Sequence, residues 1–87
     1  MTEIKNVVVY STDPCSFCSN AKALLRQRGI GFEEINLGKD PAGRAELAAR
    51  TGLMSFPQIV IDDEVVGGFR ELLEADRTGR LTQLVAA

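Results

Sequence analysis

Residues 7–18 read VVVYSTDPCSFC, and this stretch decides how the chain is expected to fold. Val7–Tyr10 are β-branched and aromatic residues, which are typical of a strand that is buried on both faces. Turn residues follow from Ser11 to Pro14 and end the strand. From Cys15 to Arg28, small and apolar residues recur at helical spacing, at positions 18, 21, 24 and 25. The stretch therefore predicts a strand, a short turn and a helix that begins at Cys15.

Cys15 and Cys18 are the only cysteines in the chain, and they lie three positions apart at the start of the predicted helix. Free backbone N–H groups and the positive end of the helix dipole favour a thiolate there, and cysteines so placed can have a pKa of roughly 3.5–7.5 instead of about 8.5. Cys18 is one turn further along, close enough to form a disulfide with Cys15. The pair predicts thiol–disulfide chemistry in which Cys15 attacks and Cys18 resolves the intermediate.

The cysteine pair has two alternative interpretations. A structural zinc ion takes four Cys or His ligands, whereas this chain has two Cys and no His, so one chain alone cannot complete such a site. Free cysteines also occur as small buried hydrophobic residues without reactivity. The position between a strand and a helix favours the redox interpretation over both.

Composition limits the possible classes of protein. With 87 residues, of which 45% are hydrophobic and 25% charged, the chain is expected to form one domain over residues 1–87 with a single core. The net charge of -2 and the scattered lysines and arginines give no basic surface for nucleic acid, so we expect no nucleic-acid partner. No apolar stretch approaches the ~20 residues that cross a bilayer, and Met1–Lys5 lack the pattern of a secretory signal. We expect a cytoplasmic protein without a membrane partner.

The next two elements extend the first strand and helix into a larger unit. Residues 32–37 alternate apolar and polar side chains, as a strand with one buried face does. Because a helix connects them, the strands at 7–10 and 32–37 are expected to be parallel, with a right-handed connection. Asp40 and Pro41 are typical of a helix start, and the helix that follows is expected to end near Gly52.

The last third of the chain predicts a hairpin and a helical tail. Residues 57–61 and 64–66 read as short antiparallel strands joined at Asp62 and Asp63. After Gly67 and Gly68, the tail from Phe69 predicts one or two short helices, divided near Thr78 and Gly79.

Three segments resemble the dithiol glutaredoxins: YSTDPCSFC at 10–18, SFPQI at 55–59 and VGGF at 66–69. The resemblance covers essentially the whole chain. It implies an α/β, thioredoxin-like fold with a mixed four-stranded sheet flanked by helices, in the order β-α-β-α-β-β-α. It also implies that glutathione is the reductant or a substrate and that Cys15 forms the mixed disulfide.

The resemblance further implies a glutathione-binding groove. In the family, a proline like Pro57 follows a cis peptide, and the backbone of the preceding residue, here Phe56, pairs with bound peptide like an added strand. Arg44 falls where the family often has a cation or Gln facing the glycyl carboxylate. Gly68 is expected to allow close approach of the backbone to the ligand.

Several positions depart from the family pattern. Thr12 stands where the family often has lysine, and Ser16-Phe17 replaces a Pro-Tyr pair. Phe17 keeps an aromatic face at the site, while Ser16 adds a backbone N–H near the sulfur and a hydroxyl expected to cap the helix. Asp13 opposes the thiolate through its negative charge. Arg70 and Glu71 stand where a small polar residue and Asp are common, and Glu71 is expected to receive the ligand's amino end.

These residues predict a glutathione-dependent oxidoreductase that reduces protein disulfides or glutathionylated proteins, monomeric in this role. One alternative is an iron–sulfur module, in which Cys15 from each of two chains and two glutathione thiols hold a 2Fe-2S cluster. Another is a redoxin that takes electrons from thioredoxin reductase and donates them to ribonucleotide reductase, an option that Thr12 leaves open.

Overall fold

The apolar run at the start of the chain forms a central strand of a four-stranded sheet in the computed structural model, which describes residues 6–86. Strand order is β2-β1-β3-β4. The strands are β1 Val7–Ser11, β2 Glu33–Asn36, β3 Gln58–Ile61 and β4 Glu64–Gly67. β1 is parallel to β2 and antiparallel to β3, and β4 is antiparallel to β3. The predicted parallel unit and hairpin are confirmed, whereas the expectation for Met1–Lys5 lies outside the described residues.

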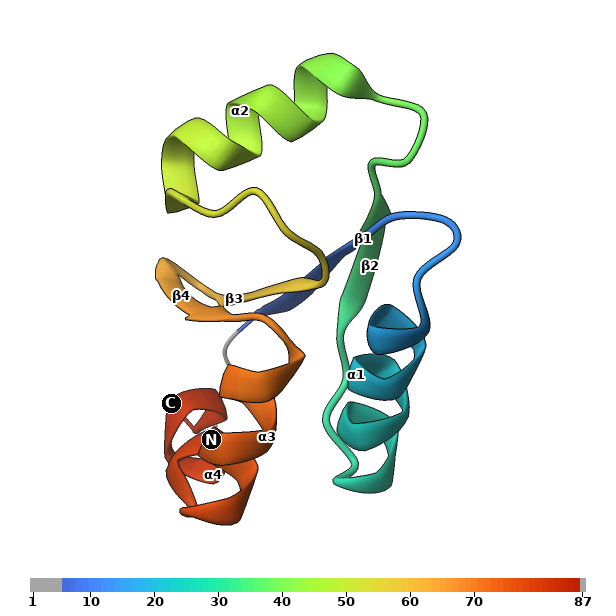
Figure 1. Cartoon of the computed structure of the whole chain (residues 1–87). Coiled ribbons are helices and arrows are strands. Elements are labelled where there is room, and N and C mark those ends of the chain that lie inside the picture. Colours follow the sequence, from blue (N-terminus) through green and yellow to red (C-terminus); the bar gives the residue numbers. More distant parts are fainter. Residues whose placement is uncertain (1–5, 87) are drawn as a thin grey trace.

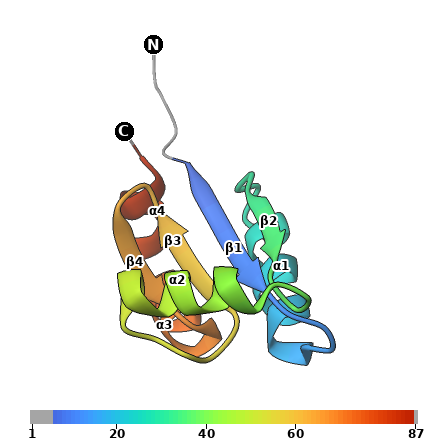
Figure 2. The same ribbon diagram turned by 90° about the horizontal axis from the view of Figure 1, so that it is seen from above.

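Helices cover both faces of this sheet (Figures 1 and 2). The helices are α1 Ser16–Gln27, α2 Pro41–Thr51, α3 Phe69–Arg77 and α4 Arg80–Val85. α2 lies across one face alone, while α1, α3 and α4 lie on the other (Figure 1). The tail holds two helices divided at Thr78 and Gly79, which is one of the two forms predicted for it, and Gly79 ends helical geometry there with a left-handed φ of 81°. None of the helices in residues 6–86 is long and apolar enough to cross a membrane.

The main core lies between the sheet and α1, α3 and α4. Its buried members are Val7, Val9, Ala21, Leu24, Leu25, Ile59, Ile61, Leu72, Ala75 and Leu81. Each fully buried Leu, Ile or Val side chain contributes about 1.5–3 kcal/mol through removal of apolar surface from water. Arg28 adds a paired hydrogen bond from Nε and Nη2 to the carboxylate of Asp76, at 2.7 and 2.9 Å, which joins the end of α1 to α3. The core thus holds α1 and α3 against the same face of the sheet.

Candidate active site

Cys15 is the N-cap residue of α1, with the extended dihedral angles φ -155° and ψ 101°. The helix itself begins at Ser16, so α1 is one residue shorter at each end than the predicted helix. Cys15 and Cys18 form a disulfide, with their Cα atoms 5.2 Å apart. The Cys15 sulfur accepts a hydrogen bond from the backbone N–H of Cys18 at 3.1 Å. The expectation that the Ser16 hydroxyl caps the helix is therefore wrong, because the Cys15 sulfur occupies the capping position.

Burial distinguishes the two cysteines. Cys18 is 2% exposed, whereas Cys15 is half-buried at the end of the helix. An external thiolate therefore has access to Cys15, while Cys18 is positioned to exchange with its neighbour. The geometry matches the predicted roles of an attacking and a resolving cysteine.

A groove of about 510 Å³ begins at the end of α1 that carries the cysteines. Its lining residues are Phe17, Ser55, Phe56, Pro57, Gly68, Phe69, Arg70, Glu71 and Leu73. The structure thus brings together most of the predicted ligand-binding residues, with the exceptions of Thr12 and Arg44. Ser55, Phe69 and Leu73 were not predicted to line it. The ring of Phe17 stacks on that of Phe69, and the two rings form an aromatic wall of the groove. The available sequence signal for this wall was the aromatic residue at the start of α3.

The loop before β3 contributes Ser55, Phe56 and Pro57 to the groove. The Phe56–Pro57 peptide is cis, as expected, and the Asp13–Pro14 peptide is also cis. Gln58 is 1% exposed, and its side chain supports this loop. Its amide donates to the carbonyls of Leu53 and Ser55 at 3.0 and 3.1 Å, and its carbonyl oxygen accepts from the Thr51 hydroxyl at 2.8 Å. Sequence reasoning missed this role, although a polar residue in the apolar run 57–61 was the available signal.

The charged side chains of the groove are not equally free. Glu71 accepts a hydrogen bond from the backbone N–H of Gly68 at 2.7 Å, which fixes its carboxylate at the start of α3. A Cβ atom at Gly67, where φ is 121°, would lie 2.9 Å from Cγ of Glu71. Arg70 takes part in none of the ion pairs found in residues 6–86. This end of the groove therefore offers the Arg70 cation, which is unpaired among the described residues, next to a Glu71 carboxylate that is held in place by Gly68.

Arg44 and Thr12 lie outside the groove. Nη1 of Arg44 donates to the carbonyls of Leu37 and Gly38, at 2.6 and 2.9 Å, and so braces the connection between β2 and α2. Thr12 lies in the loop before Cys15, where its Cα is 3.8 Å from the position that a Cβ at Gly38 would take. Both residues thus lie near Gly38, in the connection between β2 and α2.

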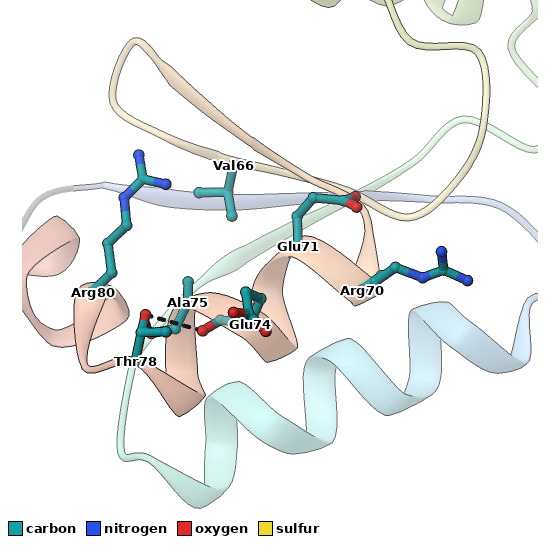
Figure 3. A pocket seen from close by; sticks show the side chains of 7 residues that line it. All are labelled: Val66, Arg70, Glu71, Glu74, Ala75, Thr78 and Arg80. Atoms are coloured by element: carbon teal, nitrogen blue, oxygen red, sulfur yellow. Dashed lines mark hydrogen bonds between the residues drawn. The ribbon is translucent and has the colours of Figure 1, made fainter.

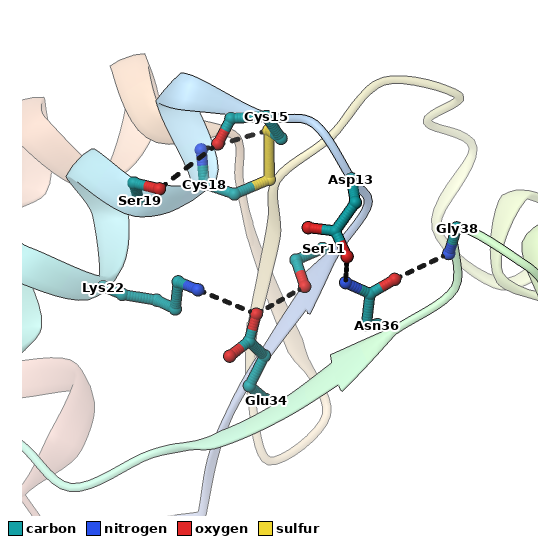
Figure 4. A network of polar contacts seen from close by, with 9 residues as sticks. All are labelled: Ser11, Asp13, Cys15, Cys18, Ser19, Lys22, Glu34, Asn36 and Gly38. Atoms are coloured by element: carbon teal, nitrogen blue, oxygen red, sulfur yellow. Dashed lines mark hydrogen bonds and ion pairs between the residues drawn. A yellow bond between two sulfur atoms is a disulfide. The ribbon is translucent and has the colours of Figure 1, made fainter.

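A polar network joins β1, β2 and α1 next to the cysteines (Figure 4). The buried Ser11 hydroxyl and the Lys22 ammonium both donate to Oε2 of Glu34, at 2.7 and 2.9 Å. These two hydrogen bonds, that of Lys22 first, lower the pKa of Glu34 below its usual value. The network was not predicted from the sequence.

A second hollow of about 450 Å³ lies between β4 and α3 (Figure 3). Its lining residues are Val66, Arg70, Glu71, Glu74, Ala75, Thr78 and Arg80. Neither hollow is lined by a cysteine, but only the 510 Å³ groove is lined by Phe17, which lies between Cys15 and Cys18 in the chain, so the groove is the candidate ligand site beside the disulfide. Within residues 6–86, no group of three or more His, Cys, Asp or Glu side chains has a metal-binding arrangement.

Comparison with known proteins identifies the family. The sequence model of the glutaredoxin family matches residues 7–66. A glutaredoxin of Pseudomonas aeruginosa is 42% identical over 81 residues, covering 93% of this chain and 96% of the relative. Glutaredoxin 3 of Escherichia coli is 38% identical over 80 residues, covering 92% of this chain and 96% of the relative.

Solved structures show the same fold. The crystal structure of the buckwheat glutaredoxin–glutathione complex superposes with a TM-score of 0.85 at 30% identity, covering 93% of this chain and 76% of the other. The solution structure of glutaredoxin from Brucella melitensis superposes with a TM-score of 0.85 at 37% identity, covering 95% of this chain and 90% of the other. With its cysteine pair at the start of α1 and its thioredoxin-like sheet, this chain belongs to the glutaredoxin family, whose members are thiol–disulfide oxidoreductases.

Proposed function

We propose that this glutaredoxin uses glutathione to reduce protein disulfides and glutathionylated proteins through Cys15 and Cys18. The observation that supports this most is the difference in access, since Cys15 is half-buried at the N-cap of α1 whereas Cys18 is 2% exposed. One sulfur meets external partners, and the other reacts only with the first. The buckwheat relative, whose structure is a glutathione complex, supports the choice of ligand.

Reduction of the oxidised protein takes two glutathione molecules. The thiolate of the first attacks Sγ of Cys15, the bond to Cys18 breaks, and Cys18 leaves as a thiolate that takes up a proton. The second attacks the glutathione sulfur of the mixed disulfide, which releases the Cys15 thiolate and glutathione disulfide. Two electrons pass from the two glutathione molecules to the cysteine pair.

The reduced protein runs the reverse chemistry on its substrates. The Cys15 thiolate attacks a substrate disulfide and releases one substrate thiol, and Cys18 then attacks Sγ of Cys15 to release the second. The N–H of Cys18, 3.1 Å from Sγ of Cys15 in the disulfide, is placed to stabilise that thiolate. With a glutathionylated protein, Cys15 takes the glutathionyl group and a second glutathione removes it, so Cys18 is not required.

We assign glutathione to the groove beside Cys15. Phe17, Phe56, Pro57 and Gly68 provide apolar and backbone surface along it. Arg70 is the free cation for a ligand carboxylate, while Glu71 has one oxygen already bonded to Gly68. The ligand would reach Arg44 and Thr12 only at the β2 side of the active-site loop, where Nη1 of Arg44 is already engaged by two carbonyls.

The electron source is tested by reducing the oxidised protein in two parallel assays. One supplies NADPH, glutathione reductase and glutathione, and the other supplies NADPH and thioredoxin reductase. We expect rapid NADPH oxidation only in the first. Reduction only by thioredoxin reductase would overturn the glutathione assignment and support a redoxin that supplies ribonucleotide reductase.

The proposal also includes a monomer, a single domain over residues 1–87 and a reducing compartment such as the cytoplasm, where glutathione keeps thiols reduced. The 2Fe-2S alternative needs Cys15 from two chains and two external thiols. Anaerobic purification followed by a visible absorption spectrum and size-exclusion chromatography tests it. A colourless monomer supports the proposal, and a coloured dimer that bleaches as it dissociates contradicts it.

A further inference from the structure

Asn36, the last residue of β2, joins two loops through the two ends of its side-chain amide (Figure 4). Its Oδ1 accepts a hydrogen bond from the backbone N–H of Gly38 at 2.8 Å, and its Nδ2 donates to Oδ2 of Asp13 at 2.8 Å. Because the N–H of Gly38 requires an acceptor, the bond to it fixes the orientation of the amide. The amide therefore presents a donor to the Asp13 carboxylate.

Close packing of the two loops supports this arrangement. A Cβ atom at Gly38 would lie 3.0 Å from Oδ1 of Asn36 and 3.2 Å from the backbone nitrogen of Asp13. The N–H of Leu37 also donates to the carbonyl of Ser11 at 2.8 Å. The end of β2 is thus held directly against the loop that leads to Cys15.

The position of the Asp13 carboxylate matters because Asp13 is two residues before Cys15. A carboxylate disfavours a thiolate near it, and the repulsion grows as the two charges approach. Figure 4 shows one oxygen of the Asp13 carboxylate directed at Asn36, which lies on the β2 side of the loop. We propose that Asn36 is a positioning residue that holds the Asp13 carboxylate on the β2 side of the loop and so keeps Cys15 reactive as a thiolate.

Other charged groups surround this loop. On the elements next to the loop they are Lys22 on α1, Glu34 on β2, Lys39 before α2 and Arg44 on α2, and the groove adds Arg70 and Glu71 on α3. Lys22 is paired with Glu34, Nη1 of Arg44 binds backbone carbonyls, and Glu71 binds the N–H of Gly68. The contact from Asn36 is a hydrogen bond to the one charge that lies in the loop itself.

The test measures how fast iodoacetamide alkylates Cys15 as a function of pH, in reduced protein of a Cys18→Ser background. The Asn36→Ala variant is expected to raise the pH midpoint by about 0.5 unit, roughly a threefold loss of thiolate below the midpoint. Asp13→Asn is expected to lower the midpoint. In the double variant Asp13→Asn/Asn36→Ala, the effect of Asn36 should vanish, because no carboxylate remains to be positioned.

Asn36→Asp separates the two halves of the amide. It keeps an acceptor for the N–H of Gly38 but removes the donor to Asp13 and adds a negative charge. The pH midpoint of Cys15 alkylation is therefore expected to rise more than in Asn36→Ala. An unchanged midpoint in folded Asn36→Ala and Asn36→Asp would overturn the proposal. An Asn36→Ala shift of equal size with and without the Asp13 carboxylate would overturn it as well. The assay contains no glutathione, so it stands or fails separately from the proposed reductant.

Discussion

The aromatic rings of Phe17 and Phe69 lie 6.1 Å apart at an interplanar angle of 26°, and they join the first turns of α1 and α3. This contact connects the helix that carries the cysteines to the helix that carries Arg70. Phe17 is 60% exposed, so the stack leaves a large aromatic surface open to the groove.

Phe69→Ala is expected to weaken glutathione binding. An aromatic pair is worth about 0.5–1.5 kcal/mol beyond area burial, so we expect KM for a glutathione mixed disulfide to rise roughly 2-fold to 10-fold. Phe69→Tyr keeps the ring and should remain near wild type. Met54→Ala, at a residue that is 86% exposed and outside the groove lining, is the control. An unaltered KM in folded Phe69→Ala would exclude the stack from ligand binding.

Arg70→Glu replaces the cation of the groove by an anion. We expect a higher KM for the glutathione mixed disulfide with little change in kcat, and a difference from wild type that shrinks as salt is added. Arg50→Glu makes the same change in net charge at an exposed position on α2 and should leave KM unchanged. If the two variants behave alike, Arg70 acts through net charge and does not contact the ligand.

The two cysteines are expected to differ in their effects on activity. In the Cys15→Ser variant, protein disulfides and glutathione mixed disulfides should both be reduced only at the uncatalysed rate, because the thiolate that attacks external disulfides is missing. Cys18→Ser should keep mixed-disulfide reduction and lose the reduction of protein disulfides through the dithiol. Steady-state assays with one substrate of each kind measure this split. Equal loss in both variants would contradict the separate roles.

Gln58→Leu is expected to destabilise the protein by about 1–3 kcal/mol, because the partners of the buried amide lose their hydrogen bonds. Urea unfolding measures the free energy, and Gln83→Leu, at an exposed position of α4, is the matched control. KM for glutathione should rise in the same variant, since the side chain supports the groove loop. Full retention of stability would show that water replaces these contacts.

The lowered pKa of Glu34 predicts an acid dependence of stability. A carboxyl group with a folded-state pKa below its unfolded value near 4.5 stabilises the fold above that value and loses this contribution as pH falls through the folded pKa. The contribution should be below about 1 kcal/mol, since the pair with Lys22 is partly solvated. Urea midpoints of wild type and Glu34→Gln should therefore differ near pH 6 and converge near pH 2. A difference between the two urea midpoints that stays constant from pH 6 to pH 2 would contradict a stabilising role of the ionised Glu34 carboxylate.

The local pattern of the sequence predicted most of the fold. Alternation and turn residues located every strand, and Asp40, Pro41 and Gly52 located both ends of α2. The helix boundary at Cys15 was missed by one residue because a sulfur serves as the cap, a role usually taken by oxygen-bearing side chains. Ile35 is only half-buried because β2 is an edge strand, a position that the sequence does not specify.

The candidate site was predictable where single residues define it. Cys15, Cys18 and the cis Phe56–Pro57 peptide agree with expectation. The contacts of Arg44 and Glu71 were not predictable, because their partners are backbone C=O and N–H groups. Which of these groups lack a partner in a helix or sheet is decided only when the chain folds. For the same reason, the bond between Asn36 and Asp13 joins residues that no local pattern connects.

The match to the family model ends at residue 66, whereas the groove continues through Gly68, Phe69, Arg70, Glu71 and Leu73. One part of the groove lining, residues 68–73, is thus separate in the chain from the cysteine pair, whereas Phe17, Phe56 and Pro57 lie within the matched segment. If the groove binds the ligand as proposed, transplanting residues 68–73 from a relative should change the thiol preference without altering Cys15, Cys18 or the loop before them.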